Sequence, residues 1–139
     1  MNDGDPVRKY VLDTHRETLV AVQECADVVA AGRDWAAGAT DGRTLAADLE
    51  RELRREEVLG AFPDLLAGAA AAADHDLPAT PVAAPPYVAV TSVGPVARAT
   101  LDERRLVITV QAFDVERGEC ARYVRRPRSP AEALAVEFR

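Results

Sequence analysis

The sequence predicts an α+β fold in which a helical part precedes a sheet. Three observations lead to this prediction: apolar residues recur at helical spacing before residue 77, four prolines interrupt residues 77–86, and strand-like alternation follows. At 139 residues, the chain has the size of one domain with one core. We therefore predict a single domain over 1–139, divided into a helical part (1–76), a proline-rich crossover (77–86) and a β-rich part (87–139).

The first predicted helix opens at Asp5 as N-cap, with Pro6 in the first helical position, and stops at Gly32. Its apolar or small residues repeat at spacings of three, four and seven, which marks one helix face. This face comprises Val7, Val11, Thr18, Val22, Cys25 and Val29, widened by Leu19 and Val28. Residues 34–42 form a predicted loop in which Trp35 covers the helix ends, a ligand or partner contact being the alternative.

Two further helices are predicted before the crossover. The second spans 44–59, since leucines repeat every four residues at Leu45, Leu49 and Leu53, and it ends at Gly60. The third follows Phe62-Pro63-Asp64 and contains the alanine block 69–73. Because alanine favours helices and has a small side chain, we expect this helix to pack closely against a neighbour.

The β-rich part predicts four strands, at 87–93, 96–101, 105–115 and 121–125. The turn between the second and third is Asp102-Glu103, and Glu116-Arg117-Gly118 forms a hairpin loop with Gly118 in a left-handed conformation. Connections this short join antiparallel neighbours, so we expect a meander of about four strands. Ser129 to Glu132 has the form of a capping box, and 134–138 predicts a short extended end.

The two faces of the predicted sheet differ. Leu106, Ile108, Val110 and Ala112 share one face of the third strand, which is wholly apolar. The opposite face is mixed and carries Arg98, Thr100, Arg105, Thr109 and Gln111. This pattern is typical of a sheet covered by helices on one side only, so the three helices should pack on the apolar face. The mixed face should meet solvent or a partner.

The charge composition argues against two classes of partner. The net charge is −6 and the isoelectric point is about 4.9, so the surface should repel nucleic acid and anionic membranes. Lys9 is the only lysine against sixteen arginines. This acidic, arginine-rich composition fits a cytoplasm at high salt, where charge repulsion is screened. With no apparent secretory signal and no apolar segment of spanning length, we expect a soluble cytoplasmic protein.

Basic residues concentrate late in the chain. Residues 1–97 hold 8 basic and 16 acidic side chains, whereas 98–128 hold 8 basic and 5 acidic. The favoured interpretation is that the arginines of 122–128 pair with the acidic helices of the same molecule. The alternative is a contact surface for a partner or a nucleic acid. Its candidate residues are Arg98, Arg105, Arg122, Arg125 and Arg126.

Residue patterns for catalysis are missing from the sequence. His15 is expected to border the apolar face of its helix, and Asp74-His75-Asp76 to be the polar end of a helix rather than a metal site. Ser92 lies outside a nucleophile elbow, and no phosphate-binding loop is present. Cys25 and Cys120 fit small buried hydrophobes. We therefore predict no catalytic, cofactor-binding or metal-binding residues.

The segment 85–92, followed by Gly94-Pro95-Val96 and 98–101, resembles small uncharacterised proteins of halophilic archaea. The resemblance extends over most of the chain. It supports the high-salt interpretation and implies no activity, cofactor or catalytic residue.

Three functional hypotheses follow. The leading one is a non-enzymatic protein-interaction or regulatory module, including a homodimer joined through the open sheet face or an edge strand. The second is a nucleic-acid-binding module that uses the five candidate arginines, with Tyr87, Phe113 or Tyr123 stacking on bases. The third is an enzyme whose site the sequence does not reveal.

Overall fold

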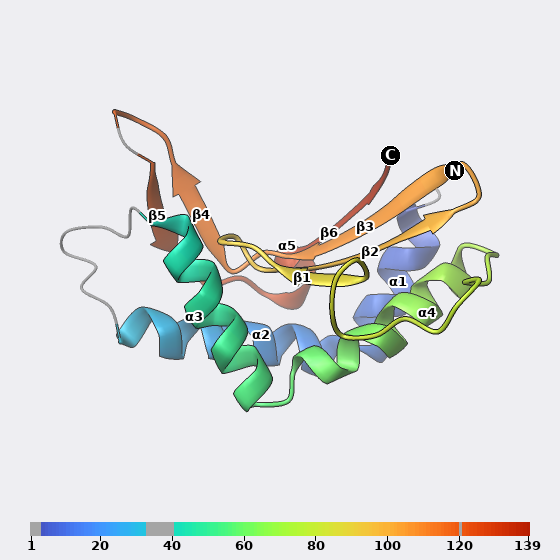
Figure 1. Cartoon of the computed structure of the whole chain (residues 1–139), viewed down its shortest axis with the longest axis horizontal. Coiled ribbons are helices and arrows are strands. Elements are labelled where there is room, and N and C mark those ends of the chain that lie inside the picture. The colour runs from blue at the N-terminus through green and yellow to red at the C-terminus, as the bar shows by residue number, and fades with distance from the viewer. Residues whose placement is uncertain (1–3, 33–40, 120) are drawn as a thin grey trace.

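The computed structural model describes residues 4–32, 41–119 and 121–139, and it has an α+β fold with helices first (Figure 1). The α-helices in these ranges are α1 (Gly4–Thr14), α2 (Arg16–Ala31), α3 (Gly42–Arg55), α4 (Phe62–Ala72) and α5 (Pro130–Ala133), and a 3-10 helix, η1 (Leu59–Ala61), precedes α4. The strands are β1 (Val88–Val90), β2 (Pro95–Leu101), β3 (Arg104–Val110), β4 (Phe113–Glu116), β5 (Arg122–Arg125) and β6 (Leu134–Phe138). The predicted fold class is confirmed, but these ranges contain five α-helices rather than three.

The first predicted helix is divided into α1 and α2 at His15, which leaves helical geometry at φ −118° and ψ 25°. The backbone N–H of His15 still donates to the Val11 carbonyl (2.8 Å), and that of Leu19 donates to the His15 carbonyl (3.2 Å). The bend thus keeps its backbone hydrogen bonds. It lets α1 pack against α4 and β6 while α2 packs against α3 and α5. The helix also begins at Gly4, so Asp5 lies in its first turn and is not the cap.

The predicted apolar face of these helices is largely confirmed. Val7, Val11 and Leu19 are fully buried, whereas Val28 is 54% exposed and its assignment to the core was wrong. The expectation for Trp35 falls in 33–40, outside the described residues.

Helix α3 begins two residues before the predicted start because Asp41 caps it. The Asp41 carboxylate accepts hydrogen bonds from the backbone N–H groups of Arg43 (3.0 Å) and Thr44 (3.2 Å). Its three predicted core leucines, Leu45, Leu49 and Leu53, are fully buried. The helix ends at Arg55, earlier than predicted, because Glu57 adopts a left-handed conformation (φ 60°) that an α-helix cannot contain.

The predicted four-stranded meander is wrong in its connections. The four-stranded antiparallel sheet has the order β1-β2-β3-β6, and β4 and β5 form a separate two-stranded ribbon. The predicted strand 105–115 therefore contains two strands from two sheets. They separate because the N–H groups of Ala112 (2.9 Å) and Phe113 (3.0 Å) both donate to the Val93 carbonyl, which turns the chain away from the sheet.

The place beside β3 is taken by β6, the predicted extended end of the chain. The capping box is present: the Ser129 hydroxyl accepts from the Glu132 N–H (3.3 Å), and the Glu132 carboxylate accepts from the Ser129 N–H (3.1 Å). The Asp102-Glu103 turn is also confirmed, since Leu101 pairs with Arg104. Gly118 does not adopt the predicted left-handed conformation.

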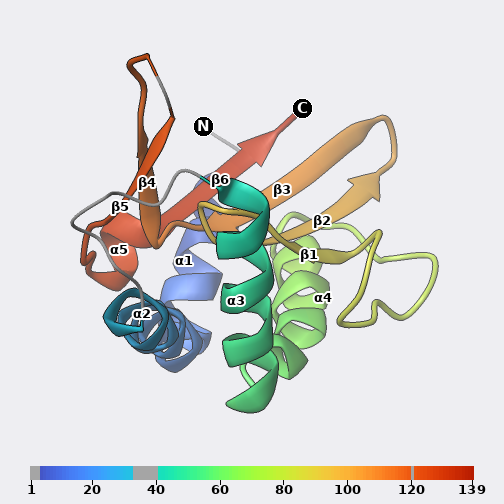
Figure 2. The same cartoon turned by 60° about the vertical axis from the view of Figure 1, so that its left-hand side comes forward.

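The helices cover one face of the four-stranded sheet and leave the other open, as Figures 1 and 2 show from two directions. The apolar face predicted for β3 is confirmed, since Leu106, Ile108, Val110 and the following Ala112 are fully buried. The close packing predicted for α4 is confirmed by the full burial of Ala69 and Ala70. The β4–β5 ribbon projects from the end of the molecule opposite the β2–β3 turn.

Candidate binding site at the edge of the sheet

The five candidate arginines do not form one surface. Arg98 in β2 and Arg105 in β3 are exposed on the open face of the four-stranded sheet. Arg122 and Arg125 belong to β5, and Arg126 follows that strand. The fold therefore separates two arginines on the sheet from three on the ribbon.

Arg125 is a structural residue. Its side chain is 9% exposed and lies between α2 and the ribbon, where Nε donates to the Asp27 carboxylate (3.0 Å). Its other guanidinium nitrogens donate to the backbone carbonyls of Ala112 (2.9 Å), Arg126 (2.8 Å) and Gln23 (3.1 Å). The predicted pairing with an acidic helix is thus confirmed for Arg125.

The neighbouring arginines pair within the ribbon instead of with helices. Arg126 forms ion pairs with Asp114 (2.7 Å) and Glu116 (2.9 Å), both in β4, and Arg128 also pairs with Asp114. Arg122 is exposed on β5. Three of the four arginines of 122–128 therefore form ion pairs with carboxylates of their own molecule. Arg125 pairs with Asp27, and Arg126 and Arg128 pair with Asp114.

Arg98 and Arg105 differ from Arg125, Arg126 and Arg128 in having no carboxylate partner among the residues that the structure describes, a property they share with Arg122. The register places Arg98 opposite Val107 and Arg105 opposite Thr100, so the two arginines are diagonal neighbours on adjacent strands. The Arg98 Nε–H donates to the Pro86 carbonyl (3.0 Å), which ties its guanidinium to the end of the crossover.

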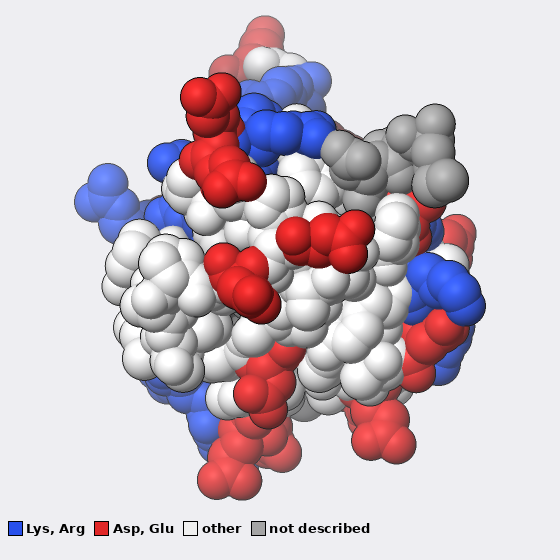
Figure 3. Space-filling view, turned by 90° about the vertical axis from the view of Figure 1, so that its right-hand side faces the viewer, with Lys and Arg blue, Asp and Glu red and all other residues white. Residues whose placement is uncertain are grey.

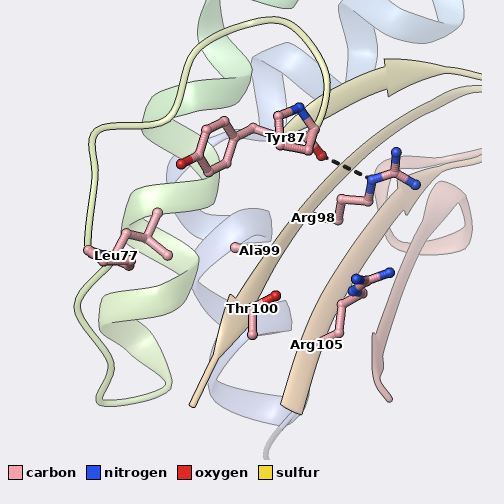
Figure 4. A pocket seen from close by; sticks show the side chains of 8 residues that line it. Leu77, Tyr87, Arg98, Ala99, Thr100 and Arg105 are labelled. Carbon is pink, nitrogen blue, oxygen red and sulfur yellow. Dashed lines mark hydrogen bonds between the residues drawn. The ribbon is translucent and has the colours of Figure 1, made fainter. Parts of the chain in front are cut away.

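A pocket of about 380 Å³ lies beside these arginines. It is lined by Leu77, Pro78, Pro86, Tyr87, Arg98, Ala99, Thr100 and Arg105. Figure 4 shows Arg98 and Arg105 extending to the same side of their strands, with Leu77 and Tyr87 on the crossover side of β2. We refer to this site, with these eight lining residues, as the edge pocket. It combines two guanidinium groups with apolar walls.

The edge pocket lies where β2 continues past the end of β1. The Arg98 N–H donates to the Tyr87 carbonyl (2.8 Å), so β2 still has a neighbour at this position. Successive N–H groups of a strand point to opposite edges, so the Thr100 N–H points to the same edge of β2 as the Arg98 N–H. At Thr100, β1 no longer pairs with this edge. The pocket therefore offers a backbone donor as well as side chains.

The molecular end that lies to the right in Figure 1 has a mixed surface. Figure 3 shows Asp and Glu side chains standing apart on a largely uncharged area, with Lys and Arg near its margins. In a chain with a net charge of −6, Arg98 and Arg105 place two positive charges, unpaired with any carboxylate in the described ranges, on adjacent strands of the sheet.

A second cavity, of about 320 Å³, lies between α2 and α3 and contains Cys25 with Glu24, Glu52 and Glu56. Burial raises the pKa of the Cys25 thiol to about 11, and the three glutamates add to this effect. Since the thiolate is the nucleophile, the neutral thiol makes this cavity unsuited to cysteine catalysis near neutral pH.

We predict that Cys25 resists alkylation near neutral pH. In a Cys120→Ser variant, which leaves Cys25 as the only cysteine, about one thousandth of the thiol is ionised at pH 8, and iodoacetamide labelling should accelerate as the pH rises toward 11. Labelling followed by mass spectrometry measures this, with the variant unfolded in urea as control. Labelling at pH 8 as fast as in urea would contradict the prediction.

The histidines lie in structural settings. The Tyr10 hydroxyl and His15 Nε2 share a hydrogen bond (2.9 Å), and burial lowers the pKa of His15 against the opposing effect of Asp64. His75 follows α4, as predicted, and its Nδ1 lies 3.2 Å from the Asp102 carboxylate. Throughout 4–32, 41–119 and 121–139, no group of three or more His, Cys, Asp or Glu residues is placed to hold a metal ion. Over the same ranges, no helix has the length and apolar character to span a membrane.

The sequence did not reveal the contribution of the crossover. Leu77, Pro78 and Pro86 line the edge pocket, but in the sequence they indicate only a linker. The aromatic residues proposed for base stacking are less available than expected. Phe113 is fully buried, and Tyr123 packs against the core and over Gly42. Tyr87 alone of the three lines the pocket.

Comparison with known proteins gives a family and no activity. No curated protein and no solved structure matches this sequence. A family model described as a domain of unknown function, DUF7988, matches residues 5–139, nearly the whole chain. This protein therefore belongs to the DUF7988 family of domains of unknown function.

Proposed function

We propose that this protein is a protein-interaction module that binds an acidic segment of another protein on the open face of its four-stranded sheet. The observation that carries the proposal is the pair Arg98 and Arg105, which are exposed on adjacent strands and lack carboxylate partners among the described side chains. Guanidinium groups match carboxylates through paired hydrogen bonds, so an acidic segment complements this face.

The proposal includes a high-salt, cytoplasmic setting, supported by the acidic composition with a single lysine. At 1 M salt the screening length is about 3 Å, so long-range attraction contributes little. Recognition must then depend on direct contact and on hydrogen-bond geometry. Arg98 suits this requirement because its bond to the Pro86 carbonyl restricts the guanidinium before a partner binds.

Nucleic acid is the less favoured partner. Of the five arginines that this hypothesis uses, Arg125 and Arg126 bind groups of their own molecule, and Phe113 is buried. The three remaining arginines are divided between the sheet face (Arg98, Arg105) and the ribbon (Arg122). Together with one half-buried tyrosine they are a small basis for phosphate binding, which weakens steeply as salt rises. Self-association through the same face remains an outcome that the experiment must distinguish.

The test is capture of partners by the tagged protein from an extract of its source cells at native salt. The expected result is a protein with an acidic segment that wild type retains and the double variant Arg98→Ala/Arg105→Ala loses. The matched control is Arg122→Ala, which removes an exposed arginine from the ribbon and should retain the partner. Retention by the double variant, or capture of nucleic acid or of the chain itself alone, would contradict the proposal.

A further inference from the structure

We infer that the edge pocket binds a carboxylate group attached to a small apolar body. This inference rests on the proposed function, because it uses the same two arginines, and it specifies what they bind. The pocket has charged donors on one side and apolar walls on the other, an arrangement that orients a ligand with one anionic end.

The donors suit a carboxylate. The Arg98 Nε is committed to the Pro86 carbonyl, which leaves the two terminal nitrogens of its guanidinium for a ligand. Arg105 makes no side-chain hydrogen bond or ion pair in the part of the chain that the structure describes. Thr100 is exposed, pairs directly with Arg105 and adds a hydroxyl to the pocket lining (Figure 4). A carboxylate has two oxygens, and this set supplies donors for both.

The backbone of the pocket argues against phosphate as the preferred anion. Phosphate sites usually present several backbone N–H groups to the ligand. Here Pro78 and Pro86 have none, and the N–H groups of Tyr87, Arg98 and Arg105 donate to the carbonyls of residues 84, 87 and 139. The backbone donors that remain are the Thr100 N–H, directed past the end of β1, and the Leu77 N–H, which donates to no group in the described part of the chain. Two such donors on separate segments do not form the run of N–H groups that a phosphate site presents, whereas a carboxylate needs no such run.

The apolar side limits the size of the ligand. Leu77, Pro78, Pro86 and Ala99 provide the apolar lining, and the volume of about 380 Å³ is near the lower limit of ligand pockets, roughly 300 Å³. The pocket thus accepts a branched or short chain of a few carbons. A carboxylate on such a body has two sources: the C-terminal residue of a partner protein, or a free small carboxylic acid.

Titration with small probes, followed by the ¹H–¹⁵N NMR signals of the Thr100 amide and the Nε–H groups of Arg98 and Arg105, tests the inference. N-acetyl-leucine should produce saturable shifts, whereas N-acetyl-leucinamide, which lacks the charge, should not. Inorganic phosphate should bind at least about tenfold more weakly. Equal shifts with the amide, or tighter binding of phosphate, would overturn the inference.

Two peptide probes distinguish the sources of the carboxylate. If the natural ligand is a chain terminus, N-acetyl-Ala-Ala-Leu with a free carboxylate should bind more tightly than N-acetyl-leucine, since the extended peptide reaches the unpaired edge of β2. Equal affinities would assign the pocket to a free acid. Both results support the carboxylate site.

The variants separate this inference from the proposed function. Arg105→Ala should weaken N-acetyl-leucine binding at least about tenfold, and Arg122→Ala should leave it unchanged. Thr100→Tyr fills the pocket at an exposed strand position while keeping both arginines, so it should abolish probe binding; binding that survives would overturn the inference. Probe binding without any captured partner would disprove the proposed function alone. A partner captured through the arginines without probe binding would disprove the inference alone.

Discussion

Replacement of Gly94 by alanine is expected to lower the free energy of unfolding by about 3 kcal/mol. Gly94 is buried immediately before β2, and an added Cβ would overlap the backbone carbonyl oxygen of Val110. That carbonyl cannot move easily, because Val110 is fully buried in β3 and pairs with Leu134 in β6. On the other side, the Gly94 carbonyl accepts from the Thr91 N–H (3.0 Å), so relief of the overlap must disturb the turn or the sheet.

Urea unfolding followed by circular dichroism, at one fixed salt concentration, measures this effect. The control is Gly60→Ala in the 3-10 helix η1, where an added Cβ meets no atom within 4 Å. This control should change stability by less than about 0.5 kcal/mol, since surface substitutions without a specific contact usually do. Equal stability of the two variants would show that the close approach of Gly94 to the Val110 carbonyl in β3 does not require glycine at this position.

Removal of the Arg125 side chain is expected to cost about 3 kcal/mol of stability. Truncation to alanine deprives three backbone carbonyls and the Asp27 carboxylate of a donor at once. The bonds to the Ala112 and Gln23 carbonyls are partly buried, so water does not readily replace them, whereas the Asp27 carboxylate is 62% exposed and can be solvated. Because the Arg125 guanidinium joins α2 to the ribbon, its loss should also expose the β4–β5 backbone to hydrogen exchange before the rest of the sheet.

The matched control for Arg125→Ala is Arg122→Ala, three residues earlier on the same strand. Arg122 is exposed, so its removal should change the free energy of unfolding by less than about 0.5 kcal/mol. Denaturant unfolding and amide exchange of both variants provide the comparison. If the variants lose equal stability, Arg125 is not the link between ribbon and helix.

Much of the fold could be predicted from local pattern. The leucine repeat of α3, the alternation in β3 and the capping box before α5 each depend on residues near in sequence, and each formed as expected. The candidate site was predicted only in part. Arg98, Thr100 and Arg105 were placed on the correct face, because side chains alternate along a strand. The sequence did not predict that these three residues line one pocket together with residues of the crossover.

The sequence by itself determined the helix-then-sheet order, the open sheet face and the two arginines on it, because periodicity and turn residues act over a few positions. Only the tertiary structure decided which strand lies beside β3, which arginines have internal partners and where a pocket forms. Those outcomes depend on contacts between distant residues, such as Arg125 with Asp27 and Ala112 with Val93. No local pattern contains them, since the energy of such contacts arises only when the whole chain is folded.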